Sequence, residues 1–160
     1  LTSSYWDNLI HLGMGPTKGP AGTRAFTLPM GEARLPGIAA EDIGKCALGL
    51  LKKRDAYLGK TVGMAGEHLT RSQMAAALTK ALGREVRYNA VPPEVYRTFG
   101  FPGADDLGNM FQFKRDFNAV FCGAREPAIA RALNPGLQTF AQWLEANKGR
   151  IPLSYTEPGS

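Results

Sequence analysis

The chain has 160 residues, 44% of them hydrophobic and 21% charged, so it is long enough to bury a real core in one domain. Its net charge of +5 comes from 19 Lys and Arg residues spread along the whole chain, which argues against direct binding to nucleic acid. We find no signal peptide and no apolar run of the roughly 18 residues that a membrane span needs, so we expect a cytoplasmic protein away from membranes.

A short helix is predicted at residues 6–12, followed by a glycine-rich stretch at residues 13–19. A phosphate-binding turn follows a strand and opens an apolar helix. This stretch instead follows a helix and continues into Pro20, Ala21 and Gly22. We therefore predict a mobile surface loop over residues 13–22.

Two extended segments come next, at residues 24–30 and 32–38, joined by a turn at Gly31. From Glu41 the apolar residues recur at three- and four-residue steps, which predicts a helix. Its apolar face is expected to hold Ile43, Cys46, Ala47, Leu50 and Leu51. The basic run at residues 52–54 ends this helix, where cations complement the helix dipole. Residues 61–65 then read as a buried strand.

Thr70 and Gln73 form a capping box that predicts the start of a second long helix. Met74, Leu78 and Leu82 are expected to face inward, and Gly83 to end the helix. Residues 85–91 alternate like a strand. The second half of the chain is then predicted to be mostly helical.

In that half, the two prolines at positions 92 and 93 open a helix that runs to Phe99, and another is expected over residues 104–117. Thr139 and Gln142 repeat the capping-box pattern. Trp143 and Leu144 are predicted on the buried face of that last helix, with Gly149 as its stop.

Few residues carry a catalytic or metal-binding pattern. Asp105 and Asp106 open a helix, where carboxylates stabilise the N-terminal amides, and this interpretation is favoured over a paired acid/base site. His11 and His68 have no partner at metal-ligand spacing, so we expect no metal. Tyr57 and Lys60 are three residues apart, with a turn at Gly59 between them, and do not form a Tyr-x-x-x-Lys pair. We therefore predict no catalytic residue.

The two cysteines follow no metal or redox spacing. Cys46 is predicted to be a small core residue, with a reactive thiol as the alternative. The densest aromatic stretch extends from Phe99 to Phe121, and most of its rings are expected to pack in the core.

Three stretches resemble a known family. They are Tyr5-Trp6-Asp7-Asn8-Leu9, Gly100-Phe101-Pro102-Gly103-Ala104-Asp105-Asp106-Leu107-Gly108-Asn109-Met110-Phe111 and Gln142-Trp143-Leu144-Glu145. Together they are similar to the C-terminal half of NmrA-like proteins, atypical short-chain dehydrogenase relatives, and most like the animal members. The resemblance extends over residues 4–153.

The resemblance implies an α/β fold: the C-terminal half of an NAD(P)-binding Rossmann-type fold with a mostly helical substrate lobe. Residues 1–153 would form that part, without the N-terminal dinucleotide-binding half, and residues 154–160 a disordered tail. The cofactor implied is NADP(H) in the complete protein, with weak or no binding by this chain alone.

Site residues also follow from the resemblance. Tyr5, Trp6, Asp7 and Asn8 occupy the positions of the family's Tyr-Phe-Glu-Asn stretch, which contacts the cofactor. For Asn8 a helix N-terminal cap is the alternative. The family's substrate cleft borders the aromatic stretch, which implies pocket roles for a second group of residues, namely Phe101, Met110, Phe111 and Phe113.

The function that the resemblance implies is a redox sensor without strong catalytic activity, in which this half closes over NADP(H) and binds a protein partner. Two alternatives stay open: the substrate lobe of an NAD(P)H-dependent reductase, and a free-standing interaction module. The family further implies a homodimer, a partner among metabolic enzymes or signalling proteins, and a role in transcriptional regulation in the cytoplasm and nucleus.

Overall fold

The first of two small sheets is centred on β4 (Leu35–Ile38). The computed structural model of the protein describes residues 1–18 and 23–153. Within them, β1 (Ser4–Tyr5) pairs parallel to β4, and β5 (Glu67–Leu69) pairs antiparallel on its other side. All four residues of β4 are buried, and a side chain at Gly37 would collide with the indole of Trp6. Glycine at this position therefore lets the chain after β1 pack directly on β4.

The second sheet is centred on β3 (Arg24–Leu28), which pairs antiparallel with β2 (Thr17–Lys18) and parallel with β6 (Val86–Ala90). The predicted strands at residues 24–30 and 85–91 are thereby confirmed. Of the predicted loop at residues 13–22, Thr17 and Lys18 form a strand instead, because the β3 backbone offers them an edge; residues 19–22 lie outside the described part of the chain.

Helix α4 (Arg71–Leu82) packs against β6, and α9 (Phe140–Asn147) packs against α4. Both predicted capping boxes are present: Thr70 Oγ1 accepts from Gln73 N at 3.1 Å, and Thr139 Oγ1 from Gln142 N at 3.2 Å. Gly83 ends α4 in the left-handed region, at φ +63°. The prediction that Gly149 stops the last helix was wrong, because the 3₁₀ helix η2 (Lys148–Arg150) continues through it.

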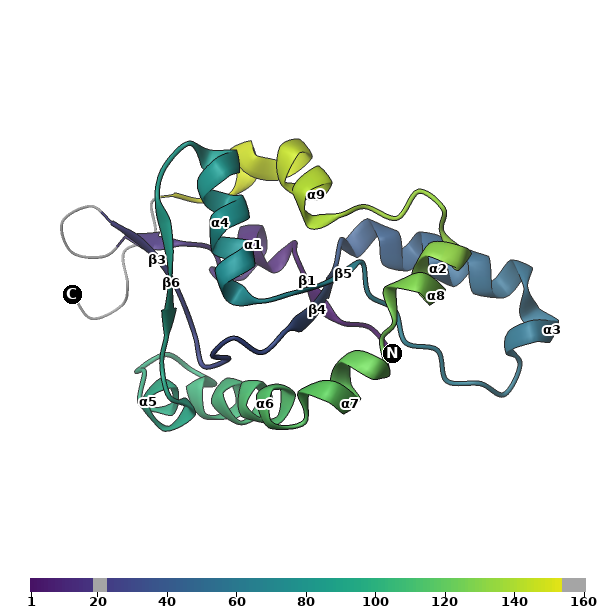
Figure 1. The fold of residues 1–160 in the computed structure, drawn as a ribbon, viewed down its shortest axis with the longest axis horizontal. Helices are drawn as coiled ribbons and strands as arrows, with labels where there is room; N and C mark the ends of the chain where they lie inside the picture. Colours follow the sequence, from purple (N-terminus) through teal and green to yellow (C-terminus); the bar gives the residue numbers. More distant parts are fainter. Residues whose placement is uncertain (19–22, 154–160) are drawn as a thin grey trace.

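A layer of three helices forms the lower edge of the molecule in Figure 1: α5 (Pro93–Arg97), α6 (Ala104–Asp116) and α7 (Asn118–Gly123). Asp105 and Asp106 lie in the first turn of α6, where their negative charges interact favourably with the helix dipole. Neither one caps the helix, since Gly103 is the N-cap residue and makes no side-chain cap hydrogen bond.

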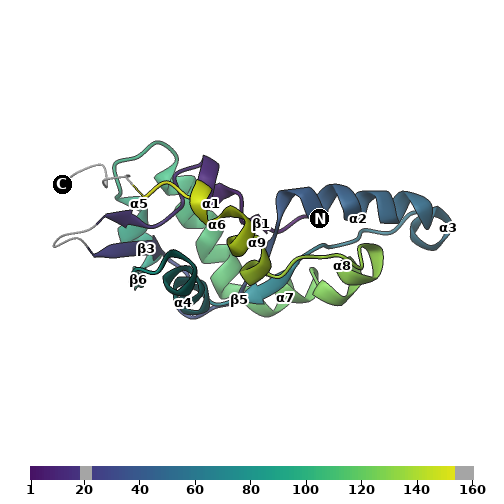
Figure 2. The same cartoon turned by 90° about the horizontal axis from the view of Figure 1, so that it is seen from above.

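At the other end of the molecule, α2 (Ala40–Lys52), α3 (Arg54–Tyr57) and α8 (Pro127–Leu133) extend away from β3, β6 and α4 (Figure 1, Figure 2). Cys46 is fully buried against α8, as predicted. Ala47 and Leu51 were wrongly predicted on the inner face of α2; Leu51 is 74% exposed. Because α8 covers only a narrow stripe of α2, the outer turns remain in solvent.

Residues 61–65 are not a strand, although residues 63–65 are buried as predicted. Two hydrogen bonds join this segment to Leu1, one on each side of Gly63. Leu1 N donates to Val62 O at 2.6 Å, and Met64 N donates to Leu1 O at 2.8 Å. Its middle, Gly63, packs against the carbonyl of Ala124, which leaves no space for a side chain. The two hydrogen bonds to Leu1 do not extend into a ladder, so no strand forms here.

Two apolar clusters result. The large cluster joins both sheets to α4, α6 and α9, and its bulkiest buried side chains include Phe111, Phe140 and Trp143. The small cluster lies between α2 and α8 and includes Ile38, Cys46 and Leu133.

Candidate functional site

A cleft of about 340 Å³ lies within the large cluster. Its walls come from β1 and the turn into α1 (Asn8–His11), from β3 and β4, from the first turn of α4 and from the inner face of α6. Apolar side chains form most of the lining, as in typical small-molecule pockets. The volume lies at the low end of the range of roughly 300–1,000 Å³ for such sites.

The predicted cofactor segment, residues 5–8, borders this cleft at the end of β1. Tyr5 is 41% exposed and lines it. Trp6 is 3% exposed and forms its floor, with its ring 5.4 Å from that of Phe140 and 6.3 Å from that of Trp143. Tyr5 ends β1 and Trp6 lies in the turn that follows it, so the two rings line the same cleft at very different exposure.

The remaining two residues of the segment differ in their surroundings. Asp7 is not part of the lining; its Oδ2 accepts from Ala40 N at 2.8 Å, which joins it to the first turn of α2. Asn8 does line the cleft. The cap position of α1 belongs to Asp7, and the Asn8 amide makes no hydrogen bond to another described side chain or backbone group. The helix-cap alternative for Asn8 is therefore wrong, and its amide is available to a ligand.

The predicted pocket residues divide into two pairs. Met110 and Phe111 line the cleft, Phe111 at 1% exposure. Phe101 packs instead against Tyr96, with ring centroids 5.8 Å apart, and is absent from the lining. Phe113 is 54% exposed and also lies outside it, because a residue two positions after Phe111 falls on the far side of a helix.

Arg71 also lines the cleft, and the sequence reasoning missed it. It is 5% exposed, its Nη1 lies 2.8 Å from Met74 Sδ, and its guanidinium lies 5.3 Å from the Phe26 ring centroid. Burial lowers the pKa of Arg71 to about 10, so the guanidinium stays charged at neutral pH. Its helical spacing could have predicted this burial, because residues 71, 74, 75 and 78 share the inward face of α4.

Lys114 was missed as well. Its Nζ lies 5.4 Å from the ring centroids of both Phe111 and Phe121. Burial, followed by the nearby charges of Arg71 and Arg125, lowers the pKa of Lys114 to about 8. The helical spacing from Phe111 was the signal, since residues three apart share a helix face.

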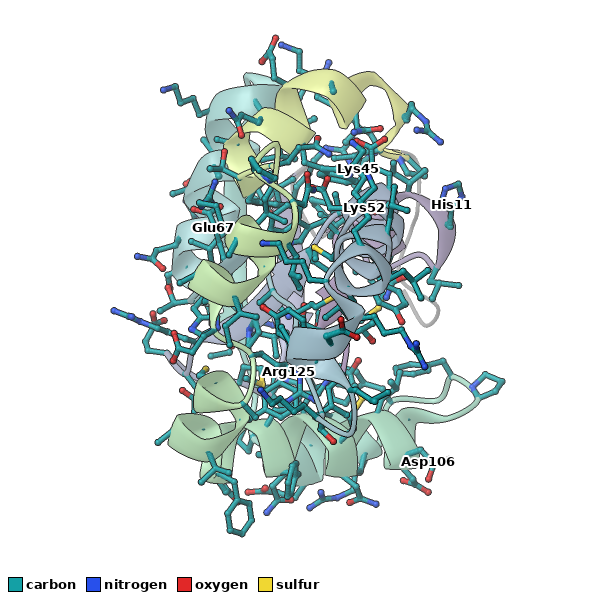
Figure 3. All side chains as sticks on the ribbon, turned by 90° about the vertical axis from the view of Figure 1, so that its right-hand side faces the viewer. His11, Lys45, Lys52, Glu67, Asp106 and Arg125 are labelled. Atoms are coloured by element: carbon teal, nitrogen blue, oxygen red, sulfur yellow. The ribbon has the colours of Figure 1, made fainter. Side chains whose placement is uncertain are left out.

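Other charged groups lie around the outside or serve the fold. Figure 3 shows Lys45 and Lys52 along α2 and Asp106 on α6, all exposed. Glu67 accepts from Phe140 N at 2.6 Å and so satisfies the start of α9. Arg125, stacked 3.8 Å from the Phe121 ring centroid, donates from Nε to Thr2 O.

Over residues 1–18 and 23–153 the structure holds no group of three His, Cys, Asp or Glu side chains placed to bind a metal ion. None of the helices described there has the length and apolar composition required to cross a membrane.

The sequence model of the NmrA-like family matches residues 1–144. The chain belongs to the NmrA-like family.

Solved structures agree on the fold. NmrA, a negative transcriptional regulator, is 22% identical, with a TM-score of 0.69 over 90% of this chain and 50% of that one. Triphenylmethane reductase from Citrobacter sp., solved with NADP(H), is 15% identical, with a TM-score of 0.70 over 91% of this chain and 50% of that one. A nucleoside-diphosphate-sugar epimerase from Staphylococcus aureus is 19% identical, with a TM-score of 0.67 over 90% and 50%.

The chain therefore has the α/β architecture of NmrA-like, NAD(P)-binding Rossmann-type proteins, and it spans about half the length of these structures. NmrA itself has been solved in complex with NAD and with NADP.

Proposed function

We propose that the chain is the cofactor-closing half of an NADP(H)-responsive regulatory protein, with the cleft beside residues 5–8 receiving the nicotinamide end. One observation carries this proposal: the Asn8 amide, which has no hydrogen-bond partner among the described residues, lines a mostly apolar cleft at the carboxyl end of parallel strand β1. Open α/β sheets bind their ligands at that end of the strands.

Tyr5 and Asn8 have complementary roles in this proposal. Asn8 donates or accepts a hydrogen bond at the nicotinamide-ribose end, and Tyr5 supplies a flat wall. Trp6 and Asp7 hold this segment in place. Trp6 packs in the core, and Asp7 accepts a hydrogen bond from the start of α2. In the complete protein, the pyrophosphate would bind the glycine-rich turn of the family's N-terminal dinucleotide-binding half. The 160-residue chain alone should therefore bind NADPH no better than millimolar.

Regulation follows if cofactor binding favours one arrangement of the cleft over another, since a ligand shifts a conformational equilibrium by its differential affinity. A protein partner, a homodimer and action in the cytoplasm and nucleus belong to the same proposal, which the likeness to the negative regulator NmrA supports at the level of family and fold.

The decisive experiment is an NADPH titration of the full-length protein and its Asn8→Ala variant. Affinity should fall by about 1–3 kcal/mol, because the polar partner of the amide is left unpaired in a closed site. Asn89→Ala is the matched control, since Asn89 is exposed on β6 and outside the cleft. Equal NADPH affinity of wild type and Asn8→Ala, with a large drop in apo melting temperature, would contradict the cofactor assignment.

A second candidate is the substrate lobe of an NAD(P)H-dependent reductase. Lys114 favours it, because an ammonium in the cleft with a pKa of about 8 is suited to deliver a proton near neutral pH. An assay of NADPH oxidation with quinone and dye acceptors separates the two: turnover that falls in Lys114→Met while NADPH affinity stays unchanged supports the reductase.

A further inference from the structure

Two cationic side chains, Arg71 and Lys114, line the mostly apolar cleft. Arg71 enters from the first turn of α4 and Lys114 from the inner face of α6. These helices lie above and below the first sheet in Figure 1. Among residues 1–18 and 23–153, the lining of the cleft includes no Asp or Glu.

Hydrogen bonding at the site is also incomplete. Over the described residues, three buried side-chain atoms have no hydrogen-bond partner: Ser3 Oγ, Arg24 Nη1 and Arg71 Nε. Ser3 and Arg71 both line this cleft. Buried polar groups are normally satisfied, and an exception at a cleft marks a place where a ligand can complete the network.

The surroundings of the two cations do not neutralise them. The groups whose charges act on Arg71 are the phenols of Tyr88 and Tyr96. Those acting on Lys114 are Arg71 and Arg125, which are positive too. Keeping a buried charge without a counter-ion is costly, so this arrangement does not serve the stability of the fold.

We propose that the cleft binds the carboxylate of a small organic acid with an apolar body. Arg71 contacts the carboxylate from α4, Ser3 from the residue before β1 and Lys114 from α6, while Met110 and Phe111 cover the apolar part. Arginine suits this task because its guanidinium binds a carboxylate through parallel hydrogen bonds. The proposal rests on the proposed function, since it names the class of ligand that shares the cleft with the nicotinamide end.

The test uses the full-length protein without cofactor and two isosteric probes, 2-naphthoate and 2-naphthamide, titrated by calorimetry. Wild type is expected to bind the acid at least about tenfold more tightly than the amide, because only the acid pairs with the cations. Arg71→Met and Lys114→Met should each weaken naphthoate binding by about tenfold or more and leave the amide unchanged.

Arg87→Met is the matched control, since Arg87 pairs with Glu85 on the surface. It should bind naphthoate like wild type. Apo melting curves show whether the variants fold, and Arg71→Met should melt no lower than wild type because it removes an unpaired buried charge. Equal affinity for acid and amide, or full naphthoate affinity in both cleft variants, would overturn the proposal.

A final titration separates an organic acid from a phosphate of the cofactor. Naphthoate should still bind when NADPH is saturating. Displacement by NADPH would assign the cations to the cofactor and overturn the organic-acid assignment. Failure of the proposed function gives a different result, namely unchanged NADPH affinity in Asn8→Ala.

Discussion

The two apolar clusters of this molecule are held together differently. The large cluster contains packed aromatic rings, of which Phe140 and Trp143 are stacked, 6.1 Å apart and nearly parallel at 10°, while Trp6 is tilted against both. The small cluster between α2 and α8 is joined through one buried carboxylate: Asp42 Oδ1 accepts from Asn134 Nδ2 at 3.0 Å and Oδ2 from Gln138 N at 2.9 Å. Burial of apolar side chains therefore stabilises the part that contains the cleft. Directional hydrogen bonds to Asp42 stabilise the α2–α8 end.

This difference decides which part can hold a ligand site. The large cluster has the greater number of buried apolar side chains among the described residues, and it contains the cleft and the two cations that line it. The α2–α8 end leaves Leu48, Leu51 and Leu58 at 51%, 74% and 68% exposure, and has no comparable excess of buried area.

The largest effect is expected at Trp143, which contacts both Trp6 and Phe140 and is 2% exposed. Trp143→Ala should lower the free energy of unfolding by about 3–5 kcal/mol, because it leaves a cavity under the cleft. Thermal or urea denaturation measures it. An unchanged melting midpoint would contradict the burial of this ring.

A smaller loss is expected from Asp42→Ala, roughly 2–4 kcal/mol, since the Asn134 amide and the Gln138 N–H lose their buried acceptor. Hydrogen exchange should show the opening confined to α2, α8 and residues 134–138. If α4 and α9 exchange faster to the same extent, the two clusters do not respond separately.

A pH-dependent effect is expected at Lys114. Its pKa of about 8 lies below the ordinary 10.5, so between these values the unfolded chain binds more protons and stability rises with pH. Lys114→Met should therefore be more stable than wild type, most clearly below pH 8. The expected gain in the free energy of unfolding is on the order of 1–2 kcal/mol, because water partly screens this group. The difference should shrink toward pH 10.5. Urea denaturation at a series of pH values tests this, and a pH-independent difference would contradict it.

The smallest effect is expected from Leu51→Ser on the exposed side of α2, within about 0.5 kcal/mol. Leu50→Ser, one position along and half-buried against the small cluster, is the matched comparison and should cost more. Equal losses for the two variants would mean that the outer face of α2 is covered in solution.

Local chemistry explains which predictions are confirmed. Both capping boxes and the glycine at the end of α4 depend on residues within four positions of each other, so their geometry can be read from the chain. The helix on residues 104–116 and the burial of Trp143 and Leu144 follow from the same short-range periodicity.

Predictions that depend on contacts between distant parts of the chain were less accurate. Residues 61–65 have the composition of a strand, yet their hydrogen bonds to Leu1 do not extend into a ladder, and Gly63 packs closely against Ala124. Of the residues that the family resemblance implied for a substrate pocket, Met110 and Phe111 line the cleft, whereas Phe101 packs against Tyr96, a contact that the sequence could not predict. Their role in substrate binding stays a prediction.

Short motifs and periods in the sequence were enough to identify the family, the α/β class and the starts of the main helices, because each depends on residues close together in the chain. Only the tertiary structure brought Ser3, Arg71 and Lys114 to one cleft, from segments far apart in the chain. Charge in a buried site is decided by which groups surround it, and in this protein those surroundings supply cations without a counter-ion, a property that no local pattern encodes.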